Sequence, residues 1–185
     1  MPETAKLTLE LIPKTNLHLR EEMLRHYSSP KGFVGRSICY SITMGGVRYG
    51  SIVGGSTPKH LPGRPFHIPL NQVVNNIFFH IEPREGYPCR NFASRCLRIF
   101  RETIAADWPL KYGDVVRRFE SLIELPRTGE AYKRDGWKEV GMTKGFTCKR
   151  SAGKGTDSWT GKRVWDTRNL RPKRVFIFEV LDAST

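Results

Sequence analysis

Cysteine is scarce in this sequence, and its arrangement does not point to a metal site. The four cysteines are Cys39, Cys89, Cys96 and Cys148, and no two of them form a CxxC pair. The five histidines are scattered as well, without HxxxH or HxH spacing. Structural zinc sites and disulfide scaffolds use closely spaced or dense ligands. The sequence therefore argues against both, and it favours an intracellular chain with reduced thiols.

Long apolar runs are also missing, and so are internal repeats. No segment is apolar enough to cross a bilayer, and no basic amphipathic helix would bind a membrane surface. The first residues, Met1–Thr4, lack the basic and apolar regions of a signal peptide. We therefore expect no membrane partner and a cytoplasmic location. Without a linker to divide the 185 residues, we predict one domain over residues 1–185.

Acidic residues are the third shortage. The chain has 18 Asp and Glu against 31 Lys and Arg, which gives a net charge of +13. An excess of this size attracts polyanions, and double-stranded DNA is the leading candidate partner. The alternatives are a charge that serves solubility only and an anionic membrane surface. The membrane has no support elsewhere in the sequence.

Two segments gather the basic residues. The first is a basic, glycine-rich loop at about 149–172 with its flanks, and the second is the proline-rich segment around Arg64. Lysines and arginines would contact phosphates while tryptophans stack on a displaced base. The alternative is a solvated loop, in which two tryptophans would be unusual. The predicted nucleic-acid contacts are Lys144, Lys149, Arg150, Trp159, Lys162, Arg163 and Trp165.

Hydrophobic periodicity predicts an alternation of strands and helices. We expect strands at 7–12, 37–43, 47–53, 77–81, 115–122, 137–148 and 175–180. We expect helices at 17–26, from Asn91 to Asp107 and around Tyr132. Gly54-Gly55 should end a strand, residues 56–69 should be irregular, and 71–76 should hold a helical turn. This pattern predicts an α/β (α+β) fold with a central mixed sheet flanked by helices.

Local signals set the ends of two helices. Asn91 can cap the long helix through its side-chain oxygen, and that helix should end before Trp108-Pro109, because the residue before proline disfavours helical geometry. Gly136 lies where the short helix around Tyr132 needs a left-handed residue. Trp137 then begins a strand.

This order of elements is similar to that of the Gcn5-related (GNAT) acyltransferases. The resemblance implies that the start of the long helix binds the pyrophosphate of coenzyme A, and that Tyr132 faces the thioester and protonates the leaving group. The usual motif at this place is Gln/Arg-x-x-Gly-x-Gly/Ala. This chain has Arg90-Asn91-Phe92-Ala93-Ser94-Arg95 instead. Ala93 replaces the first glycine and Arg95 the second small residue. The alternative role of Tyr132 is packing at the end of a helix.

A narrower resemblance is carried by many short pieces between residues 24 and 148. They are His26-Tyr27, Gly35-Arg36-Ser37, Tyr40, Gly45-Gly46, Tyr49-Gly50, Asn75-Asn76, Asn91-x-Ala93-Ser94, Asp107-Trp108, Tyr112-Gly113, Phe119-Glu120, Gly129, Tyr132, Gly136-Trp137 and Gly141-x-Thr143-Lys144-Gly145. Their number and order resemble the Mom family of phage DNA-modification proteins. That resemblance implies a phage or prophage enzyme that converts adenine to N6-carbamoylmethyladenine and protects DNA from restriction. Anti-phage defence proteins share the pattern.

The candidate catalytic residues are Tyr132, Glu120, His26 and Tyr27. Glu120 lies among apolar neighbours on a strand, so it is a candidate base; the alternative is a buried carboxylate paired with Arg118 or another basic residue. His26-Tyr27 precedes the loop where GNAT-like folds recognise the acceptor. His26 could be a base or a metal ligand with Asp107, or simply a histidine at a helix C-terminus.

The candidate substrate-binding residues are Arg36, Ser37, Asn75, Asn76, Asn91 and Ser94. The asparagines and Ser94 could hydrogen-bond an acyl carbonyl or the edge of a base, and Asn75-Asn76 could equally be turn residues. Because adenine in a duplex hides its edge, modification would require the base to be flipped out.

The acyl donor stays open between acetyl-coenzyme A and glycyl-tRNA. Acetyl-coenzyme A fits the GNAT resemblance, whereas a glycyl group would bring the nitrogen that carbamoylmethyl requires. Two other functions are considered. One is a DNA-binding defence module without catalysis, and the other is an N-acetyltransferase acting on a small amine or peptide.

Overall fold

The computed structural model describes residues 5–28, 30, 32–145, 147–148, 165–166 and 170–180. The helices are α1 (Leu17–Arg25), α2 (Phe92–Tyr112), α3 (Glu130–Arg134) and the 3-10 turn η1 (Leu70–Gln72). The strands are β1 (Leu7–Ile12), β2 (Ser37–Met44), β3 (Val47–Ser56), β4 (Val73–Ile81), β5 (Arg118–Glu124), β6 (Lys138–Met142), β7 (Thr147–Cys148), β8 (Trp165–Asp166) and β9 (Lys173–Glu179). No helix in these described ranges is long and apolar enough to cross a membrane.

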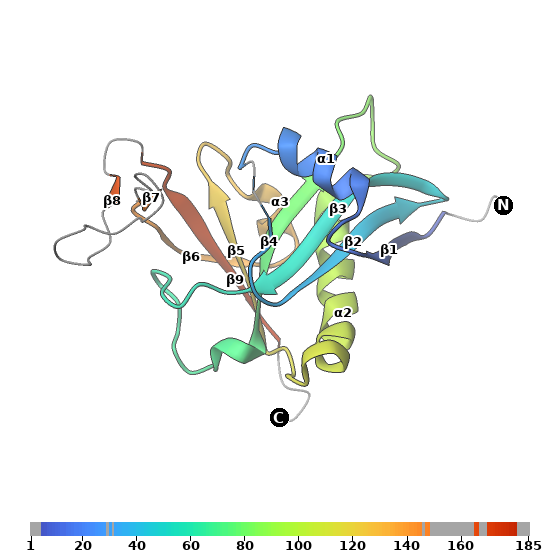
Figure 1. Cartoon of the computed structure of the whole chain (residues 1–185). Helices are drawn as coiled ribbons and strands as arrows, with labels where there is room; N and C mark the ends of the chain where they lie inside the picture. The colour runs from blue at the N-terminus through green and yellow to red at the C-terminus, as the bar shows by residue number, and fades with distance from the viewer. Residues whose placement is uncertain are drawn as a thin grey trace.

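Seven strands form one mixed sheet in the order β1-β2-β3-β4-β5-β9-β6 (Figure 1). Among the described residues, the parallel pairing is that of β4 with β5, and every other pair is antiparallel. The predicted mixed sheet flanked by helices is confirmed. β9 is the last of the described strands but lies between β5 and β6, so residues 173–179 join the strands of the sheet that come before and after α3.

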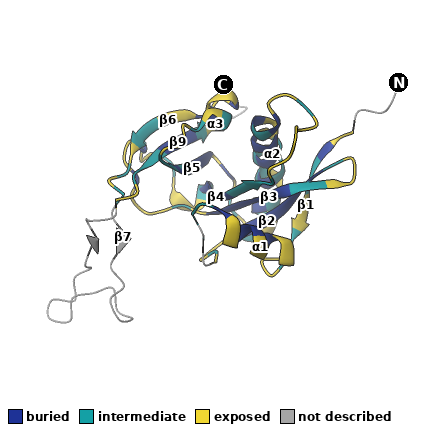
Figure 2. Cartoon of the chain, turned by 90° about the horizontal axis from the view of Figure 1, so that it is seen from above, coloured by how far each residue is buried: buried dark blue, intermediate teal, exposed yellow. Residues whose placement is uncertain are grey.

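Helices cover the two faces of the sheet unequally. Figure 2 shows α1 and α2 on opposite sides of β2, β3 and β4. The large core lies on the α2 side, where Leu97, Phe100 and Ile104 pack against Ile52 and neighbouring strand residues. A small cluster lies on the α1 side and includes Leu19 and Val53. The alternation of side chains along each strand divides the sequence between these cores.

The sequence prediction that Gly54-Gly55 ends a strand was wrong. β3 continues to Ser56, and the pairing with β4 shifts at Gly54. A Cβ on Gly54 would overlap the Ile104 side chain of α2. The glycine therefore permits close packing of the helix on the sheet and does not mark a turn.

Both predicted ends of α2 also need correction. Pro109 lies inside the helix, which ends at Gly113 in the left-handed region with φ 78°. The last turn is retained because Trp108 is buried and the Tyr112 hydroxyl donates to the Ser37 carbonyl at 2.9 Å. At the other end Asn91 has φ 59° and makes no side-chain cap. Its side-chain oxygen instead accepts from the Arg134 guanidinium at 3.0 Å.

Residues 71–76 do not form the predicted helical turn. The turn is limited to η1, and β4 begins at Val73, so Asn75 and Asn76 are strand residues. The next strand, β5, starts at Arg118, later than predicted, and Val115 before it is 61% exposed.

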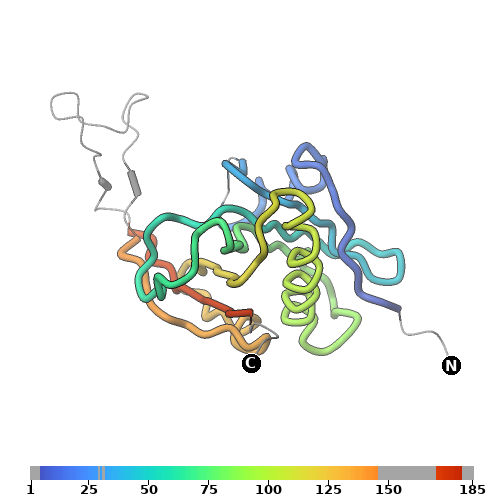
Figure 3. Tube along the Cα trace, turned by 90° about the horizontal axis from the view of Figure 1, so that it is seen from below, coloured from blue at the N-terminus to red at the C-terminus, as the bar shows by residue number. Residues whose placement is uncertain are grey.

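The predicted irregular loop is confirmed over residues 57–69, one residue shorter than expected because Ser56 belongs to β3. This loop runs close to β9 and β6 (Figure 3). Arg64 fixes it from within. Its side chain is buried, forms an ion pair with Glu120 at 2.8 Å, and donates to the carbonyls of Lys59 and Pro58. Arg64 therefore ties the loop to β5 by charge and hydrogen bonds.

Candidate active site

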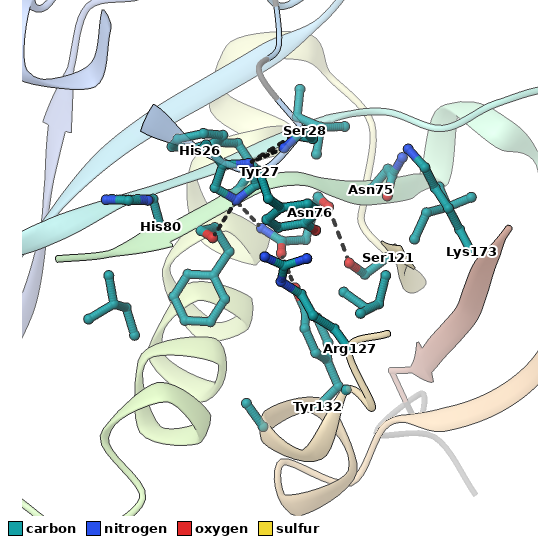
Figure 4. A pocket seen from close by; sticks show the side chains of 18 of the residues that line it. His26, Tyr27, Ser28, Asn75, Asn76, His80, Ser121, Arg127, Tyr132 and Lys173 are labelled. Atoms are coloured by element: carbon teal, nitrogen blue, oxygen red, sulfur yellow. Dashed lines mark hydrogen bonds between the residues drawn. The ribbon is translucent and has the colours of Figure 1, made fainter. Parts of the chain in front are cut away.

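The candidate site begins where the parallel strands separate. β4 and β5 pair from Val73 with Arg118 to Asn76 with Ser121, and no further. Beyond that point β4 continues to Ile81 along the edge of a cavity of about 630 Å³. The cavity is lined by His26, Tyr27, Ser28, Lys173 and residues 75–81, 121–123 and 127–132 (Figure 4). The separation of two strands thus opens the centre of the sheet.

A bulge in β4 shapes one wall of this cavity. Asn76 pairs with Gly54 and Phe78 with Val53, so Ile77 is the extra residue. The Asn76 amide nitrogen donates to the carbonyls of Val53 and Phe78, at 3.2 Å and 3.1 Å. Asn76 is therefore held in one orientation, with its side-chain oxygen free to accept from another partner.

That partner is Tyr132, which α3 carries to the floor of the cavity. Its hydroxyl donates to the Asn76 side-chain oxygen at 2.6 Å. The ring stacks on Phe176 and meets the edge of Trp137. Burial raises the pKa of the Tyr132 hydroxyl, although a hydrogen bond with Ser121 partly offsets this effect. Tyr132 consequently keeps its proton at neutral pH.

His26 and Tyr27 lie on the other side of the cavity, after the end of α1. The His26 Nδ1 lies 2.8 Å from the Ser28 hydroxyl, and the Nε2 lies 3.2 Å from the Phe79 carbonyl. Because a carbonyl only accepts, Nε2 carries the proton. Burial lowers the pKa of His26 to about 4, with smaller contributions from His80 and Arg127. The imidazole is therefore neutral at pH 7.

Tyr27 adds a flat, partly charged surface next to His26. The two rings are 4.1 Å apart, and the Arg127 guanidinium lies 3.4 Å from the centre of the Tyr27 ring. Burial raises the pKa of Tyr27, and Arg127 acts in the opposite direction. Both residues line the cavity.

A second cavity of about 280 Å³ continues the first, because Ile81 and Ala131 line both. It lies at the start of α2, where the first intrahelical bond runs from the Arg95 N–H to the Asn91 carbonyl. The N–H groups before Arg95 precede the helical ladder and can bind an anion. Arg134 lines the same cavity, whereas Arg95 is exposed and does not fill it.

The predicted substrate residues divide among three places. Asn75 and Asn76 line the large cavity, and Asn91 and Ser94 line the second. Arg36 lies elsewhere, paired with Asp114 and over the Tyr112 ring, and Ser37 bonds Tyr112 through its backbone. Arg36 and Ser37 are therefore not brought to the candidate site.

Glu120 is not brought to the cavity either. Its side chain is fully buried, and both oxygens accept from Arg64 at 2.8 Å. The alternative that we considered, a buried carboxylate with a basic partner, describes this geometry, and the partner is Arg64 and not Arg118. Arg118 instead donates to Glu179 at 2.7 Å. A carboxylate engaged in this way is poorly placed to accept a proton from a substrate.

The proposed pairing of His26 with Asp107 as metal ligands was wrong. Asp107 lies on α2 and accepts from the Tyr40 hydroxyl at 2.7 Å, on the α2 side of the sheet. His26 packs against Phe78 on the α1 side. In the described part of the chain, no group of three or more His, Cys, Asp or Glu side chains is arranged to hold a metal.

Most of the predicted nucleic-acid contacts lie outside the described residues. These are Lys149, Arg150, Trp159, Lys162 and Arg163; Trp165 is described in its backbone only, as part of β8. Lys144 is exposed. In the proline-rich segment, Arg64 is buried and is not available to a phosphate, which corrects that part of the prediction.

The sequence alone does not connect three other lining residues with the site, although Lys173 belongs to the basic C-terminal patch. Ser28, Arg127 and Lys173 line the cavity, but they belong to three segments far apart in the chain. No local motif links them, because they meet only through the sheet order that places β9 beside β5.

Comparison with solved structures identifies the fold. An acetyltransferase from Bacillus subtilis in complex with CoA aligns with a TM-score of 0.59 and 17% identity, covering 95% of this chain and 100% of that chain. An IAA acetyltransferase from Bacillus cereus aligns with a TM-score of 0.58 and 16% identity, covering 95% and 100%. A GNAT family acetyltransferase from Elizabethkingia anophelis with acetyl-CoA bound gives 0.58 and 10%, covering 94% and 98%. The chain therefore has the GNAT acetyltransferase fold.

Comparisons with protein families and with curated proteins find no match for this sequence. Identities of 10–17% to the solved structures establish the fold alone. The Mom-like activity and the DNA partner stay predictions.

Proposed function

We propose that the protein is an acyltransferase that transfers an acyl group to the amine of adenine in DNA. The observation that carries the proposal is the Tyr132–Asn76 hydrogen bond on the floor of the cavity between β4 and β5. This bond fixes the direction of a protonated hydroxyl in the cavity, and in the proposed reaction that hydroxyl faces the sulfur or oxygen leaving group. The fold supports the transfer, and the resemblance of the sequence to Mom proteins supports the acceptor.

The two cavities suit an acyl donor that ends in phosphates, such as acetyl-coenzyme A. The second cavity offers the unpaired N–H groups at the start of α2 and the Arg134 guanidinium to an anion. Asn91, in a left-handed conformation, makes the sharp entry to the helix that the usual glycines of this motif provide. The donor supplies an activated acyl carbonyl. Glycyl-tRNA stays a second donor, and its phosphates suit the same positive charge.

Transfer forms a C–N bond to the amine and breaks the bond from the acyl carbon to the leaving atom. The Tyr132 hydroxyl can give its proton to that leaving atom, and the raised pKa ensures that the proton is present at neutral pH. On the other side, the Ser28 hydroxyl and the His26 Nδ1 form a short path that can receive the proton lost by the amine. The protein thus offers one group that donates a proton to the leaving atom and one path that receives the proton from the amine.

The charge distribution supports a nucleic acid as acceptor. Arg127 and Lys173 line the large cavity, and Lys144 and Arg171 are exposed nearby, where the Arg171 N–H bonds the Gly145 carbonyl. Glu124 offsets part of this charge through contacts of 3.9 Å with Arg171 and Lys173. With a net charge of +13, the chain would bind the phosphates that flank a flipped base.

Mass spectrometry of nucleosides from plasmid DNA in cells that express the protein tests the proposal. We expect a modified adenosine whose added mass also identifies the donor, since an acetyl group differs from glycyl or carbamoylmethyl. The Tyr132→Phe variant should lose at least 99% of it. Tyr112→Phe is the matched control, because it also loses a hydroxyl hydrogen bond, but outside the cavity. Unmodified DNA from cells containing folded protein would contradict the proposal.

An N-acetyltransferase acting on a small amine is the second candidate. The observation in its favour is that full-length structural neighbours include a putative phosphinothricin N-acetyltransferase, at a TM-score of 0.55. This activity predicts release of thiol from acetyl-coenzyme A with small amines, and no dependence on DNA. A thiol-release assay with and without DNA separates the two candidates.

A further inference from the structure

The large cavity has two chemically different sides, because successive residues of a strand face opposite sides of a sheet. Asn76 faces α3 and Tyr132. Asn75, the residue before it, faces the α1 side with Phe78, against which His26 packs. Lys173 lines the cavity as well, and Figure 4 shows it next to Asn75, across the cavity from His26 and His80.

Asn75 is an unusual residue on the α1 side. Its side chain is only 4% exposed, and its Oδ1 has no hydrogen-bond partner among the described residues. A buried amide oxygen without a partner costs about 1–3 kcal/mol, and such groups are uncommon in folded proteins. Asn75 lines the cavity. A half-turn of its amide exchanges the positions of the oxygen and the nitrogen, so the oxygen can meet a donor that a ligand brings in.

A stacking surface lines the same cavity. The Arg127 guanidinium lies on the Tyr27 ring, 3.4 Å from its centre, and Arg127 is otherwise exposed. Guanidinium planes and aromatic rings both bind flat heterocycles by stacking. The His26 ring lies beside Tyr27, with the two ring centres 4.1 Å apart, and extends this surface.

We infer that the α1 side of the cavity binds a nucleobase that carries an exocyclic amine next to a ring nitrogen, with Asn75 as the residue that selects it. The Asn75 oxygen accepts from the amine and its side-chain nitrogen donates to the ring nitrogen, the bidentate contact that asparagine makes with adenine. The Arg127–Tyr27 pair stacks on the base. This inference rests on the proposed function, since it puts the amine next to the acyl carbon, but it concerns binding and can be tested without transfer.

The test measures the affinity of the full chain for five-nucleotide single strands of thymidine that carry one central test base. The test bases are adenine, purine without the amine, hypoxanthine and thymine, and no acyl donor is present. We expect the wild-type protein to bind the adenine strand about tenfold or more tightly than the purine and hypoxanthine strands. Equal affinities, or no measurable binding of any strand, would overturn the inference.

Variants assign the preference to one side chain. Asn75→Ala should reduce the adenine preference to within about twofold and leave affinity for the all-thymidine strand unchanged, which also shows that the variant is folded. Asn71→Ala is the matched control, because Asn71 is exposed and donates to Asp114 away from the cavity; it should keep the full preference. A preference that survives in Asn75→Ala would refute the role of Asn75.

The outcome is independent of the transfer reaction. Preference for adenine without any modified nucleoside in cells would keep the binding subsite and reject the proposed transfer. Modified adenosine without a preference in the binding assay would keep the transfer and reject this subsite.

Discussion

The two faces of the sheet are built by different means. On the α2 face, one large apolar cluster joins the helix to the strands and extends to Tyr132 and Trp137. On the opposite face the apolar cluster is small, and Arg64, Arg118 and Glu120 are buried with charged partners. The comparison indicates that apolar packing holds α2 to one face, whereas buried ion pairs hold the loop of residues 57–69 to the other.

Arg64→Ala should have the largest effect on stability. It leaves the fully buried Glu120 carboxylate without its partner, so we expect a loss of about 3–5 kcal/mol in the free energy of unfolding. Urea denaturation measures it. The exposed Lys59 in the same loop is the control, and Lys59→Ala should change little. If Arg64→Ala lowers the free energy of unfolding by less than about 1 kcal/mol, ion pairs do not hold the loop of residues 57–69 to the sheet.

The pH dependence of stability should also originate on the α1 side. His26 has its pKa lowered from 6.5 to about 4, so the unfolded state binds a proton first as the pH falls. The free energy of unfolding should therefore be highest, as far as His26 is concerned, above about pH 6.5. It should decrease as the pH falls towards 4 and stay constant below that. The difference of about 2.5 pKa units corresponds to about 3 kcal/mol at most. Denaturation at several pH values should show this slope in wild type and His18→Gln, but a flatter one in His26→Gln.

Gly54→Ala tests the α2 face, whose stability depends on apolar packing. The added methyl would overlap Ile104 and approach Val74, so we expect a loss of about 1–3 kcal/mol. Unlike the loss from Arg64→Ala, this loss should be insensitive to pH and salt. Gly46→Ala adds a methyl group in open space, although at a positive φ, and separates steric overlap from backbone strain. Equal losses in both variants would argue against overlap with α2.

Asp135→Asn should have the smallest effect of these variants, and we expect it in the turnover rate of the proposed transfer. Asp135 accepts from Arg101 at 2.9 Å and from the Trp137 indole at 2.8 Å, and its own N–H bonds the Tyr132 carbonyl. In the proposed reaction it is a positioning residue for Tyr132. We expect kcat to fall about tenfold, or about 1.4 kcal/mol, with KM unchanged. A change in KM alone would assign Asp135 to substrate binding instead.

The sequence predicted which helices and strands exist better than it predicted where they begin and end. Alternation and helical spacing were sufficient for the hairpin of β2 and β3, for α2 and for the short helix that carries Tyr132. The exceptions are positions where tertiary contacts outweigh local preference. Gly54 continues a strand because α2 packs on it, and Pro109 stays in a helix because Trp108 and Tyr112 are anchored.

The candidate site was predictable only in part, for a similar reason. His26, Tyr27, Asn75, Asn76 and Tyr132 stand out as residue types, and all of them line one cavity. Arg127 does not stand out, and Lys173 stands out only as one of many basic residues near the C-terminal strand. Lys173 reaches the cavity because β9 pairs with β5. Nor does a sequence reveal which of several basic residues will neutralise a buried carboxylate such as Glu120.

The place of β9 between β5 and β6 also bears on how the protein is made. A chain synthesised from its N-terminus can form β1 to β4 with α2 early, because these strands are neighbours in sequence and in the sheet. β6 must wait, since its strand partner is residues 173–179. Pairings of such long sequence separation form slowly. The nascent protein would therefore hold a folded N-terminal half while the wall that carries Lys173 is still absent, and it would acquire a complete cavity only after residues 173–179 have been made.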